Sequence, residues 1–249
     1  MNSTDQTKAI QKAVGTLEDG KIGASTINNF YKFMGNLGSI QIQYPYETNE
    51  FGCYVITGNP KETKLINGEG KKSVSNYDYS MSCTFTHPSG VTPISIMISD
   101  GKVIQPNSCR YWAGFPETVL YYTTDGKFGK KLVTHANQLP DNILWGVGGG
   151  DLKHFRLDIE GFKKFYHQGK WYDHSDVTRY TSHHGVGYDK YGNVLLISHK
   201  SCTLASFQAR CKSLGMVDGI FTDGGSVCAY NAGIYKHKTT QRQGSIIKA

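Results

Sequence analysis

The chain alternates short apolar stretches with glycine-rich polar turns over most of its length. Between residues 40 and 103 the apolar stretches are separated by clusters of Gly, Asn and Pro, a pattern typical of β-strands. Further along, Val186 and Tyr188 precede a polar turn, Asp189–Asn193, and the apolar run Val194–Ile197 follows it. This spacing predicts a β-hairpin.

Helical spacing follows that hairpin. Apolar residues at offsets of three, four and three form one face of a helix at Leu204, Phe207, Cys211 and Leu214. Thr203 can cap the start of this helix, and Gly215 stands where a glycine often closes one. The next apolar residues predict a strand over 216–222, which ends at Asp223.

Two more helices are predicted near the N-terminus. Helical spacing over 3–15 and over 25–35 is ended each time by a glycine. Residues 35–39 have the composition of a short linker. The chain is therefore predicted to divide into a helical hairpin, 1–38, and a larger domain, 39–249.

Composition favours sheet structure as well. With 29 glycines and 16 tyrosines among 249 residues, the chain is turn-rich and strand-rich and does not resemble a helical bundle. We expect an α+β fold, with a mixed or antiparallel sheet core and few helices. No apolar run approaches the roughly 18 to 20 residues that cross a bilayer, and the first residues lack the pattern of a secretory signal. We therefore expect no membrane insertion, and a cytoplasmic location at synthesis.

The net charge of the chain favours anionic partners but does not distinguish between classes of them. Twenty-seven basic against 20 acidic side chains give a net charge of +7, which favours anionic partners. Nucleic acid, a polymer with phosphodiester links, and a lysine-rich surface without a partner all fit this charge. The six cysteines show no Cys-x-x-Cys spacing, so no structural zinc site is predicted.

Two glycine-rich segments carry candidate chemistry. At Asp223-Gly224-Gly225 a carboxylate stands at a strand end beside two glycines that let a ligand approach the backbone, although an ordinary tight turn fits the same tripeptide. At Gly148-Gly149-Gly150 three glycines after a strand predict a loop whose N–H groups can bind an anion. No Lys-Ser/Thr follows them, so this is not a nucleotide-binding P-loop.

Two adjacent histidines precede the hairpin. In a strand, His183 shares one face with Gly185 and Gly187, whereas His184 shares the other with Val186. We expect a ligand to approach the glycine-bearing face, which makes His183 the site candidate and His184 a packed or solvent-facing side chain. Adjacent strand residues do not converge on one ion without a bulge, so a metal site is not predicted there.

The order of these segments resembles that of the phosphodiester glycosidase family, which includes enzymes that remove N-acetylglucosamine from a phosphodiester. The matching segments are Gly185–Asn193, Thr203–Gly215, Asp223–Ser226, Ile98–Val103, Val147–Leu152 and Gln243–Ile247. The resemblance covers roughly residues 51–249 and is strongest after Gly185. It implies hydrolysis of a sugar C1–O–phosphate bond.

The resemblance also implies roles for individual residues. Asp223 would stabilise an oxocarbenium-like centre. Binding of substrate and phosphate would fall to Gly148, Gly149, Gly150, Gly224, Gly225, Ser226 and Ser82, with Arg179 as a reserve cation if His183 does not replace the family's arginine. Three positions depart from the family: His183 stands at its arginine, Ser82 is nearest to its asparagine, and Asp151 replaces a frequent proline. The catalytic candidates are Asp223, His183 and Asp151.

The N-terminal hairpin carries a resemblance of its own. Asp19–Thr26, preceded by Gln11, is similar to the Asp-Gly-x-x-Gly-x-x-Thr core of peptidoglycan-binding modules. A piece below about 40 residues rarely folds unaided, so we expect these helices to pack on the larger domain. Binding to the bacterial cell wall and a purely docking role fit the motif equally well.

Three functions remain in view. The leading hypothesis is a hydrolase of sugar-1-phosphodiesters in a bacterial wall or capsular polymer or in a sugar nucleotide, of phage origin and virion-associated or released at lysis. The alternative is a non-catalytic protein of the same fold that sequesters a phosphorylated sugar or nucleotide. The third is nucleic-acid binding through the basic surface. The sequence requires no cofactor and leaves a divalent cation open.

Overall fold

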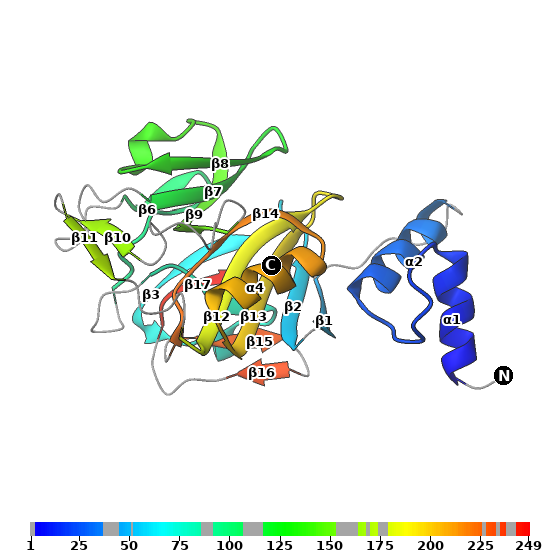
Figure 1. The fold of residues 1–249 in the computed structure, drawn as a ribbon. Coiled ribbons are helices and arrows are strands. Elements are labelled where there is room, and N and C mark those ends of the chain that lie inside the picture. Colours follow the sequence, from blue (N-terminus) through cyan, green and yellow to red (C-terminus); the bar gives the residue numbers. More distant parts are fainter. Residues whose placement is uncertain are drawn as a thin grey trace.

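The computed structural model builds the chain mainly from antiparallel strands (Figure 1). It describes residues 3–36, 45–50, 52–85, 92–106, 117–152, 164–167, 170–173, 179–225, 228–232, 235–237 and 243–249. Every pairing between described strands is antiparallel. The predicted α+β class is confirmed.

The largest sheet has ten strands. Eight of them follow one another in the order β1 (Tyr46–Glu50), β2 (Cys53–Gly58), β13 (Val194–Cys202), β12 (Thr181–Asp189), β14 (Met216–Phe221), β9 (Ile143–Asp151), β5 (Met97–Ser99) and β6 (Lys102–Gln105). The other two are β7 (Glu117–Thr123), which pairs with β9, and β8 (Phe128–Val133), which pairs with β7. Strand β9 therefore pairs with three strands, β14, β5 and β7.

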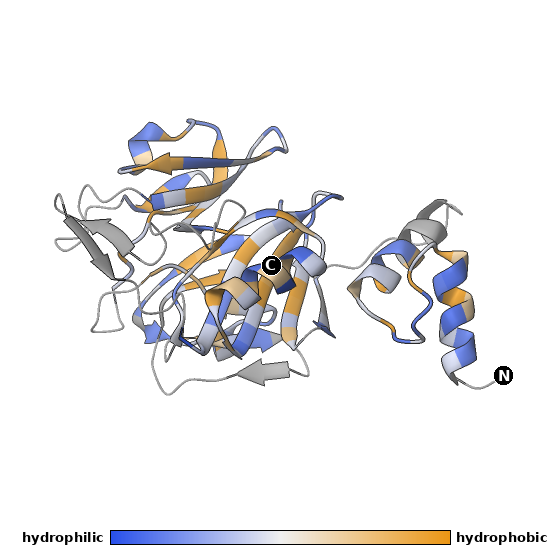
Figure 2. Ribbon diagram, in the orientation of Figure 1, coloured by the Kyte–Doolittle hydropathy of each residue, from blue (hydrophilic) through white to orange (hydrophobic). Residues whose placement is uncertain are grey.

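A smaller sheet packs on one face of the large one. Its strands, in order, are β16 (Tyr235–His237), β15 (Tyr230–Ala232), β4 (Ser80–Ser82), β17 (Gln243–Lys248) and β3 (Lys64–Lys72). One core joins the two sheets and includes Ile56, Val186, Leu196 and Ile220 from the large sheet and Leu65, Met81, Tyr230 and Ile247 from the small one. Apolar positions lie along the central strands in Figure 2. The remaining elements are the hairpin of β10 (Lys164–His167) and β11 (Lys170–Asp173) and the 3-10 turns Val74–Asn76 and Ala136–Gln138.

Helix α4 (Leu204–Ser213) covers the opposite face of the large sheet. Leu204, Phe207 and Cys211 are buried, as their helical spacing predicts. The Thr203 hydroxyl accepts a hydrogen bond from the Ser206 N–H at 3.2 Å, which confirms the predicted cap. Gly215, with φ +87°, follows the helix in the left-handed conformation that glycine adopts without strain.

The N-terminal helices are α1 (Ser3–Ala13) and α2 (Ala24–Asn36), and the loop between them is held by Gln11. The Gln11 amide nitrogen lies 2.7 Å from Oδ1 of Asp19 and 3.3 Å from the Thr26 hydroxyl, and its oxygen accepts the Gly20 N–H at 2.9 Å. Gln11 and Thr26 are buried. The residues of the Asp19–Thr26 motif thus have a structural role in this loop, and binding of cell wall stays a prediction.

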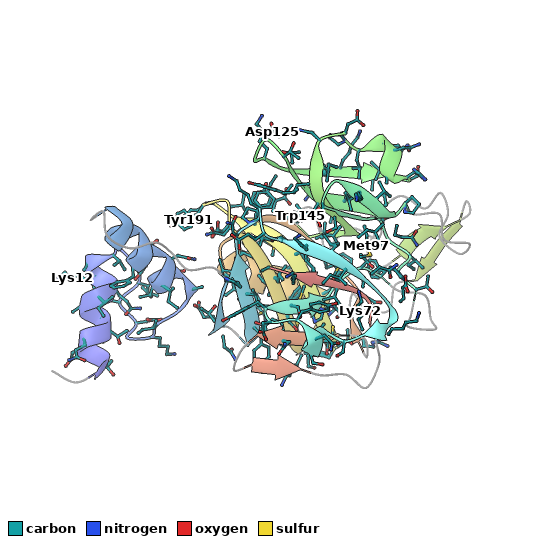
Figure 3. The ribbon with its side chains drawn as sticks, turned by 180° about the vertical axis from the view of Figure 1, so that it is seen from behind. Lys12, Lys72, Met97, Asp125, Trp145 and Tyr191 are labelled. Carbon is teal, nitrogen blue, oxygen red and sulfur yellow. The ribbon has the colours of Figure 1, made fainter. Side chains whose placement is uncertain are left out.

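Among the described residues, Tyr191 and Glu50 contact this hairpin. The Tyr191 hydroxyl donates to Oδ1 of Asn29 at 2.9 Å, and the Glu50 carboxylate lies against Gly23. Figure 3 shows Tyr191 on the side of the domain that faces the two helices. Within the described part of the chain, no helix combines the length and apolar character of a membrane span.

The packing of α4 predicts a stability effect. We expect Phe207→Ala to lower the free energy of unfolding by about 3 to 5 kcal/mol, because a fully buried aromatic ring is lost and a cavity remains. Urea denaturation measures this loss. Ser213→Ala, at an exposed position of the same helix, serves as the control and should change stability by less than about 0.5 kcal/mol. A similarly small loss for Phe207→Ala would contradict the packing described here.

Candidate functional site

The turn Asp223-Gly224-Gly225 follows β14 after one residue, Thr222. The Asp223 N–H donates to the carbonyl oxygen of Cys83 at 3.3 Å, which ties this turn to the chain just beyond β4. The Gly224 N–H donates to Oδ1 of Asp223 at 2.9 Å, and the aspartate is half-buried. The predicted strand end with its carboxylate is therefore confirmed as structure. Ser226 lies outside the described residues.

This turn packs against the start of β12 and the residue Arg179 just before it. A Cβ placed on Gly224 would lie 2.6 Å from the carbonyl oxygen of Ser182 and 3.8 Å from Nδ1 of His183. Gly225 has φ +66°, and a Cβ placed on it would lie 4.0 Å from Nη2 of Arg179. Arg179 is exposed. The fold thus brings an exposed guanidinium to the same turn as the Asp223 carboxylate.

His183 lies beneath α4, with only 3% of its surface exposed. Its ring stacks on that of Phe207 with 5.5 Å between the centroids, and its Nε2 lies 3.0 Å from the carbonyl oxygen of Cys202. A Cβ on Gly185 would lie 3.1 Å from the same phenyl ring. The expectation of an open, glycine-bearing face is wrong here, because α4 covers it. A phosphate-binding or catalytic role for His183 stays a prediction.

His184 and Ser82 meet between the two sheets. Nδ1 of His184 lies 3.1 Å from the Ser82 hydroxyl, which also accepts the Ala229 N–H at 3.0 Å. Both side chains are buried, so of the two positions expected for His184, packed or solvent-facing, the structure shows the packed one. These bonds link β4 to β12. The contact predicted between Ser82 and a sugar or phosphate stays a prediction.

Gly148, Gly149 and Gly150 belong to strand β9 and do not form the predicted loop. The Gly148 N–H donates to the carbonyl oxygen of Ile96 at 2.9 Å, and Gly150 pairs with Phe221 of β14. Pairing on both edges of β9 holds the segment in extended form. An amide engaged in a ladder is not free to bind an anion, so the nest expected of this loop is absent at Gly148.

Asp151 lies away from the Asp223 turn. It pairs with Ile220, three residues before Asp223, and its side chain points to the face opposite to that of Gly150. Lys130 Nζ donates to Oδ1 of Asp151 at 2.7 Å and also contacts the carboxylate of Asp218. All three side chains are largely buried. Asp151 thus takes part in an ion-pair cluster that joins β8, β9 and β14, and its catalytic role stays a prediction.

A carboxyl group that the sequence did not single out lies close to β9. Glu117 is the first residue of β7 and is 9% exposed, and its Oε1 accepts the Ile96 N–H at 2.7 Å. Its Oε2 lies 2.3 Å from where a Cβ on Gly148 would be, so the carboxyl group occupies the space that this glycine leaves open. A charged residue opening an otherwise uncharged strand was the available signal, but only sheet pairing places it beside Gly148.

Burial dominates the electrostatics of Glu117. Desolvation raises the pKa of its carboxyl group to about 7, against hydrogen bonds from the Ile96 amide and the Ser95 hydroxyl, which favour the ionised form. A carboxyl group with such a pKa changes its charge near neutral pH. Groups of this kind are concentrated at functional sites.

Comparison with known proteins supports the fold. No protein-family model matches the chain, and no curated protein sequence matches it. Among solved structures, the catalytic domain of zebrafish N-acetylglucosamine-1-phosphodiester alpha-N-acetylglucosaminidase, auto-inhibited by its pro-peptide, matches with a TM-score of 0.57 and 13% identity over 82% of this chain and 81% of that one. A putative exported protein of Burkholderia pseudomallei matches with a TM-score of 0.57 and 12% identity over 79% and 73%. These proteins share a fold.

Metal ligands do not gather in the part of the chain described here. Within those residues there is no group of three or more His, Cys, Asp or Glu side chains placed to hold an ion. The described cysteines Cys53, Cys83, Cys202, Cys211 and Cys228 are free thiols and are buried. Burial raises the pKa of Cys83 to about 12, so this thiol stays protonated and is a poor metal ligand at neutral pH.

The raised pKa of Glu117 predicts a pH-dependent stability. The folded protein binds this proton more tightly than the unfolded chain, so the contribution is complete below the ordinary value of 4.5 and is lost as pH rises through about 7. We expect Glu117→Gln to gain stability relative to wild type, by on the order of 2 to 3 kcal/mol, from about pH 5 to about pH 8. Urea denaturation at a series of pH values measures the difference.

Glu18→Gln provides the matched control for this measurement. Glu18 is exposed in the N-terminal hairpin, so its amide variant should follow the wild-type stability curve at every pH. Parallel curves for wild type and Glu117→Gln would show that burial does not perturb this carboxyl group.

Proposed function

We propose that this protein hydrolyses sugar-1-phosphodiesters by breaking the bond between the sugar C1 and the phosphate oxygen. The observation that carries the proposal is the Asp223 turn, which holds a half-buried carboxylate and has Nη2 of the exposed Arg179 within 4.0 Å of the Cβ position of Gly225. The fold shared with the catalytic domain of a zebrafish N-acetylglucosamine-1-phosphodiester alpha-N-acetylglucosaminidase supports it.

An anion and a cation at one turn match the charges that develop in this reaction. As the C1–O bond breaks, positive charge grows on the sugar ring and negative charge on the departing phosphate. The Asp223 carboxylate stabilises the first, and the Arg179 guanidinium binds the second through two parallel N–H donors. The phosphate is a good leaving group, so protonation of its oxygen is not the main demand on the site.

The substrate in this proposal is a phosphorylated carbohydrate. A net charge of +7 favours such anionic molecules over neutral glycans. Sugar nucleotides and the phosphodiester-linked polymers of bacterial walls and capsules both contain the sugar-1-phosphate link. The competing function is binding of the same ligands without turnover.

A panel of sugar-1-phosphodiesters that includes UDP-N-acetylglucosamine tests the proposal. The full chain is incubated with each compound while release of reducing sugar and phosphomonoester is followed, with and without added divalent cations. Release of both products from one or more compounds is the expected result. Tight binding in calorimetry without release would favour the sequestering protein, and affinity for nucleic acid that falls steeply with salt would favour the third function.

Removal of the Asp223 charge should abolish most of the turnover. Asp223→Asn keeps the size of the side chain and an oxygen that can accept the Gly224 N–H, so we expect normal folding and a loss in kcat on the order of 10² to 10³. Steady-state kinetics and a thermal melt measure the two quantities. Asp141→Asn is the control, because Asp141 is exposed in a turn preceding β9. Near-normal turnover of folded Asp223→Asn would mean that Asp223 has only a structural role in the turn.

Arg179 should contribute mainly to substrate binding. We expect Arg179→Gln to raise KM by about 10-fold or more, since a charge-assisted pair with phosphate is lost, while kcat falls less. Arg179→Lys keeps the charge but not the paired donors, so its KM should lie between those of wild type and Arg179→Gln. Lys212→Gln, which removes an exposed cation from α4, controls for net charge. An unchanged KM in Arg179→Gln would remove this residue from the phosphate site.

A further inference from the structure

Glu117 is a buried carboxyl group on β7, and the roles proposed for Asp223 and Arg179 do not involve it. Its Oε1 accepts the Ile96 N–H, and the Ser95 hydroxyl donates to the same carboxyl group. A glutamine would accept both hydrogen bonds without the cost of burying a charge. The hydrogen bonds therefore account for a polar side chain at this position but not for an ionisable one.

Strand β9 brings Glu117 and the end of β14 together. A Cβ on Gly148 would lie 2.3 Å from Oε2 of Glu117, and a Cβ on the next residue, Gly149, would lie 2.3 Å from the carbonyl oxygen of Phe221. Asp223 follows two residues later, at the strand end. In the register of β9 and β14, Phe221 lies opposite Gly150, so the chain that leads to Asp223 runs past Gly149 toward Gly148, which the Glu117 carboxyl group covers.

The groups next to Glu117 are uncharged, so burial is the main influence on the pKa of its carboxyl group. Within the described residues, β9 contributes Gly148, the segment before β5 contributes the Ser95 hydroxyl and the Ile96 amide, and β8 contributes the apolar Val133 as its ladder partner. Beyond the end of β14 the chain carries Asp223, and within β14 the titratable group is Asp218, which contacts Lys130. The ion-pair cluster of Lys130 lies on the other face of β9, to which the Asp151 side chain points.

We infer that Glu117 is the general base of the proposed hydrolysis. This inference rests on the proposed function. Glu117 takes a proton from a water molecule as the water oxygen forms a bond to C1. The C1–O bond to phosphate breaks at the same time, its electron pair leaves with the phosphate oxygen, and the products are the free sugar and a phosphomonoester. The proton on Glu117 then passes to solvent, which restores the carboxylate.

The pH dependence of turnover follows from this role. A base must be ionised to accept a proton, and burial places the pKa of Glu117 at about 7. In the wild-type protein kcat/KM should therefore rise with pH through about 7 and level off above it. The phosphodiester keeps its charge over this range, so the rise belongs to the protein.

The experiment compares wild type, Glu117→Gln and Glu117→Asp on the active compound of the panel. Glu117→Gln should lower kcat at high pH by about 10² to 10⁴ and remove the rise near pH 7. Azide, which attacks without losing a proton, should restore turnover of this variant and give a glycosyl azide. Glu117→Asp should keep the rise at reduced rate. Glu62→Gln, at an exposed position, is the control and should match wild type.

Each outcome separates the two proposals. A wild-type protein that releases sugar from no compound of the panel overturns both. An active wild type with a folded Glu117→Gln variant that keeps the rate and the same pH profile overturns the role of Glu117 alone and leaves Asp223 untouched. A slow variant that azide does not rescue would make Glu117 a positioning residue. Carbon NMR of the glutamate carboxyl groups is independent of activity, and absence of a signal titrating near pH 7 that disappears in Glu117→Gln would also overturn it.

Discussion

The candidate site depends on the volume that the glycines of β9 leave free on one face of this strand. At Gly148 the Glu117 carboxyl group fills the volume of a missing Cβ, and at Gly150 the ring of Phe221 does the same. A side chain at either position would push one of these groups away. The glycines therefore allow β7 and β14 to send large side chains over the strand between them. This packing positions the end of β14 and, after it, Asp223.

The turn after β14 is supported from two directions. The Asp223 N–H bonds to Cys83 beside the smaller sheet, while Gly224 lies against the backbone of Ser182 at the start of β12. Strand β12 is itself fixed on both faces, by Phe207 of α4 on one side and by Ser82 of β4 on the other. Rigid support of this kind holds a carboxylate in one geometry, which electrostatic stabilisation of a transition state requires.

Burial gives the two carboxyl groups different properties. Glu117 is buried beside Gly148 and the Ile96 amide, and this burial raises the pKa of its carboxyl group to about 7. Asp223 is half-buried at a turn and accepts a backbone N–H. Carboxyl groups in different environments can take different tasks in acid–base chemistry. The proposed division, with Asp223 as the stabilising charge and Glu117 as the base, follows that rule.

Local spacing was sufficient to predict the helix over 204–213, the hairpin of β12 and β13, and a strand ending at Asp223, because each depends on residues close together in the chain. It could not predict that Gly148–Gly150 is a strand, since glycines carry no side-chain pattern and their extended form depends on pairing with distant strands. Nor could it predict the neighbours of Glu117. The sequence by itself determined the elements and the carboxylate at the strand end. Only the tertiary structure decided which carboxyl groups lie near one another, because antiparallel pairing joins residues that are far apart in the chain.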